Sequence, residues 1–264
     1  MHNKIILLFF FASCFQILQS QIKERSNFCT PSSDQQFRSS IYQREIIPDT
    51  YVTFDLDYKA FEKQLTEALP KTYTNKRDQK TTVYLPNPEG EMEEYIVWRD
   101  NLLPKKLNDR YPEISVYAGY SKNDPHKTVK FDFTSKGFRA ISRGLGGSTY
   151  YIDPIAKGVK STIISYYKKD YTNRPAFECL VEDSDKKEVH THDHAPQRIA
   201  GDCNLHTFEL ALACTGEYAT FHGGTKNAVM AEYVTSINRI NSLYENEIGV
   251  RLVLIPNTDN LIFL

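Results

Sequence analysis

The feature that most constrains the fold is a strict two-residue alternation between residues 128 and 134. The apolar positions are Val129, Phe131 and Phe133, and the polar positions between them are Lys130, Asp132 and Thr134. Because successive side chains of a β-strand point to opposite faces, this pattern predicts a strand with one buried face. The other face is expected to lie in water, as is common in antiparallel sheets.

Short strand-like runs lie on both sides of this segment. They cover residues 81–85, 94–98, 114–120, 138–142, 149–152 and 162–167. The first two runs are joined by the turn-rich sequence Pro86–Gly90, which predicts a hairpin, and Gly137 is placed to turn one strand into the next. An antiparallel sheet is therefore expected.

A helix is predicted over residues 57–69. Phe61, Leu65 and Leu69 recur every four residues, and a proline follows that would end the helix. Together with the strands, this pattern predicts that residues 51–180 form one α+β domain, an antiparallel sheet with a helix packed against it.

The first twenty residues have the organisation of a secretory signal peptide. A cationic Lys4 precedes an apolar run from Ile5 to Leu18, and the small Ser20 is followed by a polar stretch. We expect residues 1–20 to be removed and the mature protein to be secreted, with no membrane-spanning segment. A lipid anchor at Cys14 is disfavoured because the apolar stretch before that cysteine is very short.

Two other stretches show no sustained apolar period. Residues 21–50 are predicted to be a flexible lead-in, and residues 181–203 a linker, because the run from Glu182 to Glu188 is almost wholly charged. Three histidines stand at alternate positions of this linker, namely His190, His192 and His194. They share one side of an extended chain and could bind a metal ion together. A solvated loop is the favoured interpretation, since nothing in the sequence positions them.

Residues 204–264 show a strand–helix–strand order. Phe208–Cys214 is strand-like, and Val250–Ile255 is a nearly continuous apolar run typical of a central strand. Between them, Thr225 or Asn227 can cap a helix. The apolar face of this helix would consist of Val229, Met230, Tyr233, Val234, Ile237, Ile240, Asn241 and Tyr244. This order predicts a crossover unit with parallel strands.

Glycines flank the predicted helix at both ends. Gly249 is placed to end it, and Gly223 and Gly224 predict a tight turn before it. An anion-binding cradle at the glycine pair is the weaker alternative. The printed chain stops within the apolar run Leu261–Leu264, so we expect the domain to be truncated here.

Charge and cysteine content narrow the function. Lysine plus arginine number 32 and aspartate plus glutamate 33, which argues against a nucleic-acid partner held by bulk charge. The cysteines of an exported chain would be Cys29, Cys179, Cys203 and Cys214. Their even number predicts up to two disulfides, with the pairing left open. Six strand tyrosines could present a glycan-binding face, although strand aromatics more often pack in a core. They are Tyr117, Tyr120, Tyr150, Tyr151, Tyr166 and Tyr167.

Several blocks of this chain resemble the secreted reprolysin-like (metzincin) zinc metallopeptidases of bacteria. The main blocks are Phe208–Thr225, Thr235–Asn241 and Tyr244–Asn257, which are similar to the first strand, first helix and second strand of such a catalytic domain. The blocks Tyr111–Tyr120, Ser135–Phe138 and Tyr151–Pro154 are similar to the propeptide regions that precede it. The resemblance implies a propeptide-like α+β domain followed by the N-terminal part of a metzincin-like α/β catalytic domain in residues 204–264.

The resemblance also implies a function. The full-length protein would be a secreted zinc-dependent metalloendopeptidase precursor that hydrolyses protein or peptide substrates by means of zinc-activated water. The zinc motif HExxHxxGxxH does not occur in the printed chain, so no catalytic or zinc-binding residue is assigned and this fragment is expected to be inactive. Cys179 and Cys203 are candidates for a cysteine switch that caps the zinc, with disulfides as the favoured alternative. A non-enzymatic adhesion module or a propeptide-type inhibitor remain the other candidate functions.

Overall fold

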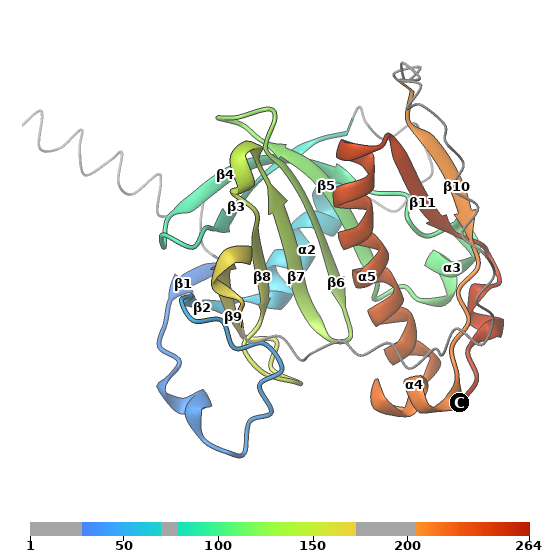
Figure 1. The fold of residues 1–264 in the computed structure, drawn as a ribbon, viewed down its shortest axis with the longest axis horizontal. Coiled ribbons are helices and arrows are strands. Elements are labelled where there is room, and N and C mark those ends of the chain that lie inside the picture. The colour runs from blue at the N-terminus through green and yellow to red at the C-terminus, as the bar shows by residue number, and fades with distance from the viewer. Residues whose placement is uncertain (1–27, 70–78, 173–203) are drawn as a thin grey trace, which may run out of the picture.

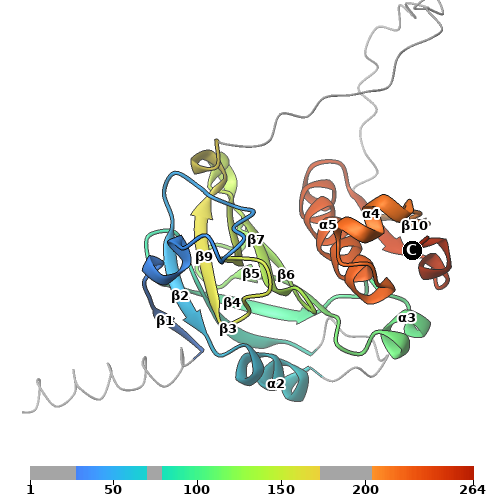
Figure 2. The ribbon, with the colours of Figure 1, turned by 90° about the horizontal axis from the view of Figure 1, so that it is seen from below.

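The computed structural model describes residues 28–69, 79–172 and 204–264. The predicted signal peptide and the whole of the predicted linker, with its three histidines, lie outside these residues. The described part is a mixed α/β structure with four α-helices and a large, mostly antiparallel sheet that is curved almost into a barrel (Figures 1 and 2). Among the described residues, no helix is long and apolar enough to span a bilayer.

Nine strands form the large sheet, in the order β1-β2-β9-β8-β7-β6-β5-β4-β3, with every neighbouring pair antiparallel. The strands are β1 (Cys29–Pro31), β2 (Val52–Leu56), β3 (Thr81–Pro86), β4 (Met92–Arg99), β5 (Ser115–Ser121), β6 (Thr128–Thr134), β7 (Gly137–Arg143), β8 (Tyr150–Pro154) and β9 (Thr162–Tyr167). The seven strands from β3 to β9 confirm the strand predictions, including the β3–β4 hairpin. The two strands β1 and β2 were not predicted.

Helix α2 (Tyr58–Ala68) packs against the concave face of this sheet and confirms the predicted helix. Its N-terminus is capped by Asp57, whose Oδ1 accepts a hydrogen bond from the Ala60 amide at 3.0 Å. Phe61 is the aromatic centre of the core, with its ring 5.3 Å from that of Phe133 and 5.6 Å from that of Phe138. The predicted apolar face of β6 therefore lies in this core.

The second unit consists of β10 (His206–Leu210), α4 (Gly216–Phe221), α5 (Lys226–Glu247) and β11 (Val250–Leu254). Strands β10 and β11 pair in parallel, which confirms the predicted crossover unit, although β10 ends four residues before Cys214. Thr225 caps α5, since its hydroxyl accepts from the Ala228 amide at 3.2 Å.

The two parts of the chain share an apolar cluster. Helix α3 (Lys105–Arg110) follows β4 and places Leu107 against the same cluster as Met230 and Val234 of α5. The backbone joins them as well, because the Leu254 amide of β11 donates to the Leu102 carbonyl at 3.1 Å. The segment around α3 thus belongs to the sheet domain by sequence and to the crossover unit by packing.

The predicted flexible lead-in is structured from residue 28 onward, which corrects the sequence-based expectation. Phe37 of the 3-10 helix η1 (Gln35–Arg38) is buried in a cluster with Ile155 and Ile164, and β1 forms one edge of the sheet. A single aromatic residue in a polar segment carries no period, so the pattern did not reveal this anchor. The other 3-10 helices in the described residues are η3 (Leu145–Gly147), η4 (Lys168–Asp170) and η5 (Thr258–Leu261).

Candidate functional site: a polar interface between the sheet and helix α5

Helix α5 covers the polar face of β6. Lys130, Asp132 and Thr134 expose only 5%, 1% and 1% of their surface, so the prediction that this face lies in water was wrong. In Figure 1, α5 runs along β6 on the side of the sheet opposite α2, and Figure 2 shows the two layers from below. The polar residues of β6 are shielded by a second protein layer that carries polar groups of its own.

Two different stripes of α5 are buried. The predicted apolar stripe packs on α3 and β11, with Val229, Met230 and Val234 fully buried, whereas Tyr244 at its end is exposed. A second stripe is polar and was not predicted; it consists of Thr235, Asn238 and Ser242. Thr235 and Asn238 of this stripe supply neutral hydrogen-bonding groups to the interface.

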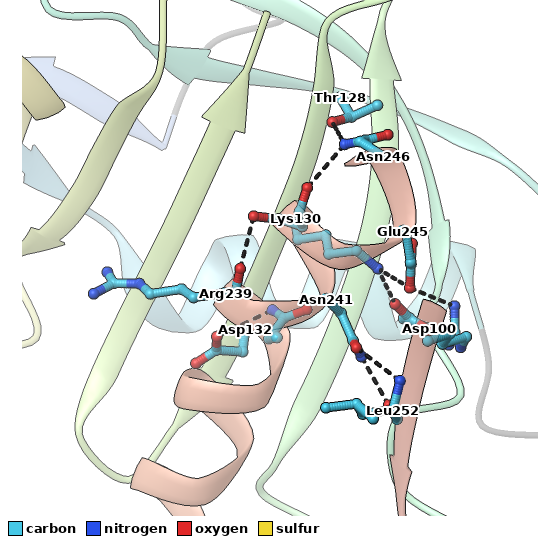
Figure 3. A network of polar contacts seen from close by, with 12 residues as sticks. Asp100, Thr128, Lys130, Asp132, Arg239, Asn241, Glu245, Asn246 and Leu252 are labelled. Carbon is cyan, nitrogen blue, oxygen red and sulfur yellow. Dashed lines mark hydrogen bonds and ion pairs between the residues drawn. The ribbon is translucent and has the colours of Figure 1, made fainter. Parts of the chain in front are cut away.

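Four charged side chains form one buried cluster of the interface, and we call them the quartet: Asp100, Lys130, Glu245 and Arg251. Figure 3 labels the first three. Lys130 Nζ donates to Asp100 Oδ2 at 2.9 Å and to Glu245 Oε1 at 3.0 Å. Arg251 donates to Asp100, and through its other terminal nitrogen to Glu245 Oε1 at 3.2 Å. Two cations and two carboxylates from four separate segments thus neutralise one another.

Asp100 of the quartet is held in its charged form. Burial alone would raise the pKa of Asp100, but the neighbouring Lys130 and Arg251 outweigh burial and hold that pKa well below its ordinary value. A buried ion pair repays the cost of losing its water only when the geometry is good and each charge keeps its partners. The main effect of such a group is to fix one relative position of the segments that carry it.

A second charged cluster lies farther along α5, around Asp153 of β8. Arg239 of α5 donates to Asp153 Oδ1 at 2.5 Å, and the hydroxyl of Tyr166 donates to Oδ2 at 2.8 Å. Arg139 of β7 donates to Glu232 of α5 at 2.9 Å and lies 3.8 Å from Asp153. This cluster again pairs two cations with two carboxylates across the boundary between the sheet and the helix.

Asp132 lies between the two clusters and differs from both. Thr235 Oγ1 donates to its Oδ1 at 2.8 Å, and Asn238 Nδ2 donates to its Oδ2 at 3.2 Å. Within residues 28–69, 79–172 and 204–264, no cation forms an ion pair with it. Burial raises the pKa of Asp132 to about 6, although the two hydrogen bonds and the fields of Arg139 and Arg239 act in the opposite direction.

Asn241 connects α5 to β11 rather than to the sheet. Its Nδ2 donates to the Leu252 carbonyl and its Oδ1 accepts from the Leu252 amide, both at 2.8 Å (Figure 3). One fully buried side chain therefore satisfies both backbone groups of a strand residue. Asn241 was predicted to lie on the apolar stripe, whereas its amide fixes the helix to its own unit.

The rim of the interface is more exposed. Arg143 of β7 donates to Glu247 at 2.6 Å, where the glutamate side chain is 55% exposed. Asn246 Nδ2 donates to the Thr128 hydroxyl at 3.1 Å. Such exposed pairs contribute little free energy, so the buried clusters and not the rim determine how α5 sits on the sheet.

The arrangement is suited to docking. A small cavity of about 40 Å³ next to the second cluster, lined in part by Lys136, Arg139, His222 and Glu232, has room for a single water molecule. Neither charged cluster leaves a carboxylate or a cation without its counter-charge. The interface can therefore hold two units in register.

A separate apolar groove of about 840 Å³ lies on the other side of α5, with the Cys214 thiol at its surface. Its lining residues are Leu212, Ala213, Cys214, Thr215, Tyr218, Tyr233, Ser236, Ile237, Ile240 and Phe263. The Tyr233 side chain is buried, and burial next to Cys214 raises the pKa of its hydroxyl. The sequence patterns did not point to this groove.

Both described cysteines have free thiols. Cys29 is buried in the sheet domain, where burial raises the pKa of its thiol to about 12, whereas Cys214 is partly exposed. They are not joined to each other. The cysteine-switch candidates Cys179 and Cys203 lie outside the described residues, together with any bond they form.

The described residues do not provide a zinc site. In the part of the chain with assigned positions, no three side chains of histidine, cysteine, aspartate or glutamate come together in a way that could hold a metal ion. The histidines at positions 190, 192 and 194 lie outside this part. Zinc is therefore assigned to no residue.

The geometry decides between the two interpretations of the glycine pair before α5. Gly223 and Gly224 have φ values of 110° and 67°, and their amides donate to the Thr220 and Ala219 carbonyls at 3.1 and 2.7 Å. The glycine pair thus forms the predicted turn, with both amides occupied rather than free for an anion.

The strand tyrosines mainly pack in cores. Tyr117, Tyr150 and Tyr166 are buried, whereas Tyr120, Tyr151 and Tyr167 are half-buried. They do not form one exposed aromatic face, so the packing interpretation is confirmed for the three buried ones.

Comparison with known proteins gives no relative. No family model matches the chain, and neither a curated protein nor a solved structure is significantly similar to it.

Proposed function

We propose that the chain is the N-terminal part of a secreted zinc-dependent metalloendopeptidase precursor. Residues 51–180 would be its propeptide, and residues 204–264 would begin the catalytic domain. The proposal rests on the sequence resemblance of blocks such as Phe208–Thr225 and on the way the two parts of the chain contact each other.

The observation that carries the proposal is the polar layer between the sheet and α5. A propeptide must hold its partner in one register before cleavage and must be able to separate afterwards. Apolar interfaces of permanent assemblies resemble a domain core, whereas interfaces between units that separate are more polar. The quartet and the cluster around Asp153 are of the second kind.

The shared apolar cluster supports a role in folding. A sheet of two parallel strands with the helices α4 and α5 is too small to be stable alone, since independent units usually need three or more strands or a larger core. Leu102 and Leu107 supply the missing apolar contacts to α5 and β11. The sheet domain would therefore help the first elements of the catalytic domain to fold.

No step of peptide hydrolysis is assigned to a residue of this chain, because the described residues hold no ligand set for zinc. The peptidase activity belongs to the proposal for the full-length protein and needs a test that includes the whole gene product.

The test compares two secreted proteins, the product of the complete gene and residues 21–264 alone. We expect about one zinc ion per chain in the first, with hydrolysis of a denatured protein substrate that a chelator abolishes and zinc restores. We expect neither property in the second. A complete gene product without bound zinc and without peptidase activity would refute the proposal, and so would chelator-sensitive hydrolysis by residues 21–264.

A further inference from the structure

Asp132 is the carboxylate on which this inference depends. The ion pairs of the two buried clusters use the carboxylates of Asp100, Asp153, Glu232 and Glu245. Asp132 is buried, with 1% of its surface exposed, and it takes part in none of the ion pairs that the described residues form. Docking of α5 thus removes the water from this carboxylate without giving it a cation.

Two neutral hydrogen-bond donors take the place of that water. The Thr235 hydroxyl and the Asn238 amide both belong to α5, so Asp132 loses both contacts when the helix leaves the sheet. A carboxylate in such surroundings binds a proton more readily than a carboxylate in water, because burial penalises the charged form.

The neighbouring charged groups do not remove this effect. The cations that act on Asp132 are Arg139 of β7 and Arg239 of α5, and both lie closer to Asp153 of β8, within ion-pair distance. On the other face of the sheet, Tyr58 of α2 is the nearby titratable group, and it stays neutral in this pH range because its own pKa is raised by burial. The partner of Asp132 on β5 is the apolar Val116.

The Asn238 amide can pair with either form of Asp132. Its Oδ1 is buried and has no hydrogen-bond partner within the described residues. If Asp132 carries a proton, rotation of the Asn238 amide by half a turn lets the carboxyl group donate to this oxygen, while Nδ2 gives up its bond to Asp132. The proton comes from solvent and no covalent bond changes. Since the number of hydrogen bonds stays the same, burial of the carboxylate decides between the two forms.

We infer that docking of α5 on the large sheet is proton-dependent, with Asp132 taking up the proton, so that the two units hold together more tightly at pH 5 than at pH 7.5. The inference rests on the proposed function only in treating the units as partners that separate after cleavage between them.

The size of the pH effect on affinity follows from the linkage between proton binding and docking. The pKa of Asp132 is raised to about 6 in the docked chain, and for the separated sheet, where this face meets water, we take the ordinary value of 3.8. Because the docked pKa is the higher one, the gain is complete below pH 3.8 and is lost as the pH rises through 6. Between pH 7.5 and pH 5 the two values give about a tenfold gain in affinity.

His222 opposes this effect and needs a control. It lies 3.8 Å from Glu232 at the edge of the interface, and burial lowers its pKa. Protonation of His222 is therefore less favourable in the docked state, which weakens docking as the pH falls. Replacing His222 with glutamine removes this second titration and should make the gain at pH 5 larger.

The experiment uses the folded chain, cut once. A specific protease site is inserted between Asp183 and Glu188, the folded protein is immobilised through an N-terminal tag, and the site is cleaved. Loss of the C-terminal piece into buffer is then followed at pH 5, 6 and 7.5 at one ionic strength. We expect release to be about tenfold slower at pH 5 than at pH 7.5, since affinity differences within one interface appear mainly in the dissociation rate.

The Asp132→Asn variant mimics the neutral form. It should release slowly at every pH, at about the rate of the wild type at pH 5. Glu247→Gln is the matched control, because it removes an exposed carboxylate of the same interface and should keep the wild-type pH dependence. Release of the wild type at equal rates at pH 5 and 7.5, or an Asp132→Asn variant that keeps the wild-type pH dependence, would overturn the inference.

A direct titration covers the case in which Asp132→Asn does not fold. The side-chain carboxyl carbon of Asp132 is followed by NMR in the uncut wild-type chain, where we expect a midpoint near 6. A midpoint below about 5 contradicts the inference, because too little proton uptake would then remain. Neither measurement uses peptidase activity, so these experiments test the proton dependence independently of the proposed function.

Discussion

Replacement of Asp100 by asparagine tests the quartet most directly. The Asp100 side chain is 2% exposed and accepts hydrogen bonds from Lys130 and Arg251. Loss of its charge leaves two buried cations with only Glu245 between them. Removing one partner of a buried pair typically costs about 3–5 kcal/mol. Since Glu245 stays at 3.0 Å from Lys130 and 3.2 Å from Arg251, we expect a value near the lower end, about 3 kcal/mol.

The assay is urea unfolding at pH 7, followed by the fluorescence of Trp98, which is the single tryptophan and lies two residues before Asp100. The free energy of unfolding of the Asp100→Asn variant is compared with that of the wild type and of Glu247→Gln. The Glu247 side chain is 55% exposed, so its loss should change the free energy by less than about 1 kcal/mol. An Asp100→Asn variant as stable as the control would show that the quartet does not act as described.

The Asp100→Asn change should also alter how the stability of the chain depends on pH. The pKa of Asp100 is lower in the folded chain than its ordinary value of 3.8, so its stabilising effect is present above that value and is lost as the pH falls below it. The wild type should therefore lose stability on acidification from about pH 4 downward more steeply than Asp100→Asn does. Adding Lys130→Met to Asp100→Asn restores charge balance and should recover part of the loss. A double variant that loses the sum of the two single effects would refute the reasoning.

Three further predictions concern other parts of the chain. Phe61→Ala empties the centre of the aromatic core and should lower the free energy of unfolding by about 3–5 kcal/mol, measured by urea unfolding. Thr225→Ala removes the cap of α5 and should lower it by about 1 kcal/mol in the same assay, whereas Thr225→Ser should leave it nearly unchanged. In the native chain a thiol reagent should modify Cys214 at neutral pH while Cys29 reacts only after unfolding, which mass spectrometry of the labelled peptides can show.

The sequence predicted the elements whose side chains follow a simple period. Strand β6 was found because Phe131 and Phe133 alternate with polar residues, and α2 because Phe61 and Leu65 recur at helical spacing. The cap of α5 was narrowed to Thr225 or Asn227, since capping depends on a residue and its immediate neighbours, and Thr225 is the one that caps the helix. These features are local, so a single sequence contains them in full.

The polar interface was missed because alternation tells which residues share a face and does not tell what covers it. Lys130 and Asp132 look the same in sequence whether they meet water or a polar partner. A signal was nevertheless present on α5, where Thr235, Asn238 and Ser242 are uncharged and lie on one side of the helix. A solvent-exposed side of a helix this long usually carries more lysine and glutamate. The pairing of these two polar faces is a long-range property that neither segment shows alone.

The two sides of the large sheet differ in what separation would cost. Around α2, opening would expose aromatic rings such as Phe61, whose transfer to water is unfavourable. Around α5, the charged groups regain their hydration on separation, so this layer contributes specificity more than net free energy. The apolar cluster of Leu107 and Met230 is the exception on the α5 side, because separation exposes it. Release of the sheet domain is therefore slow in buffer and becomes easier when other apolar surface covers this cluster, which makes Leu107 and its neighbours, and not the ion pairs, the main barrier to separation.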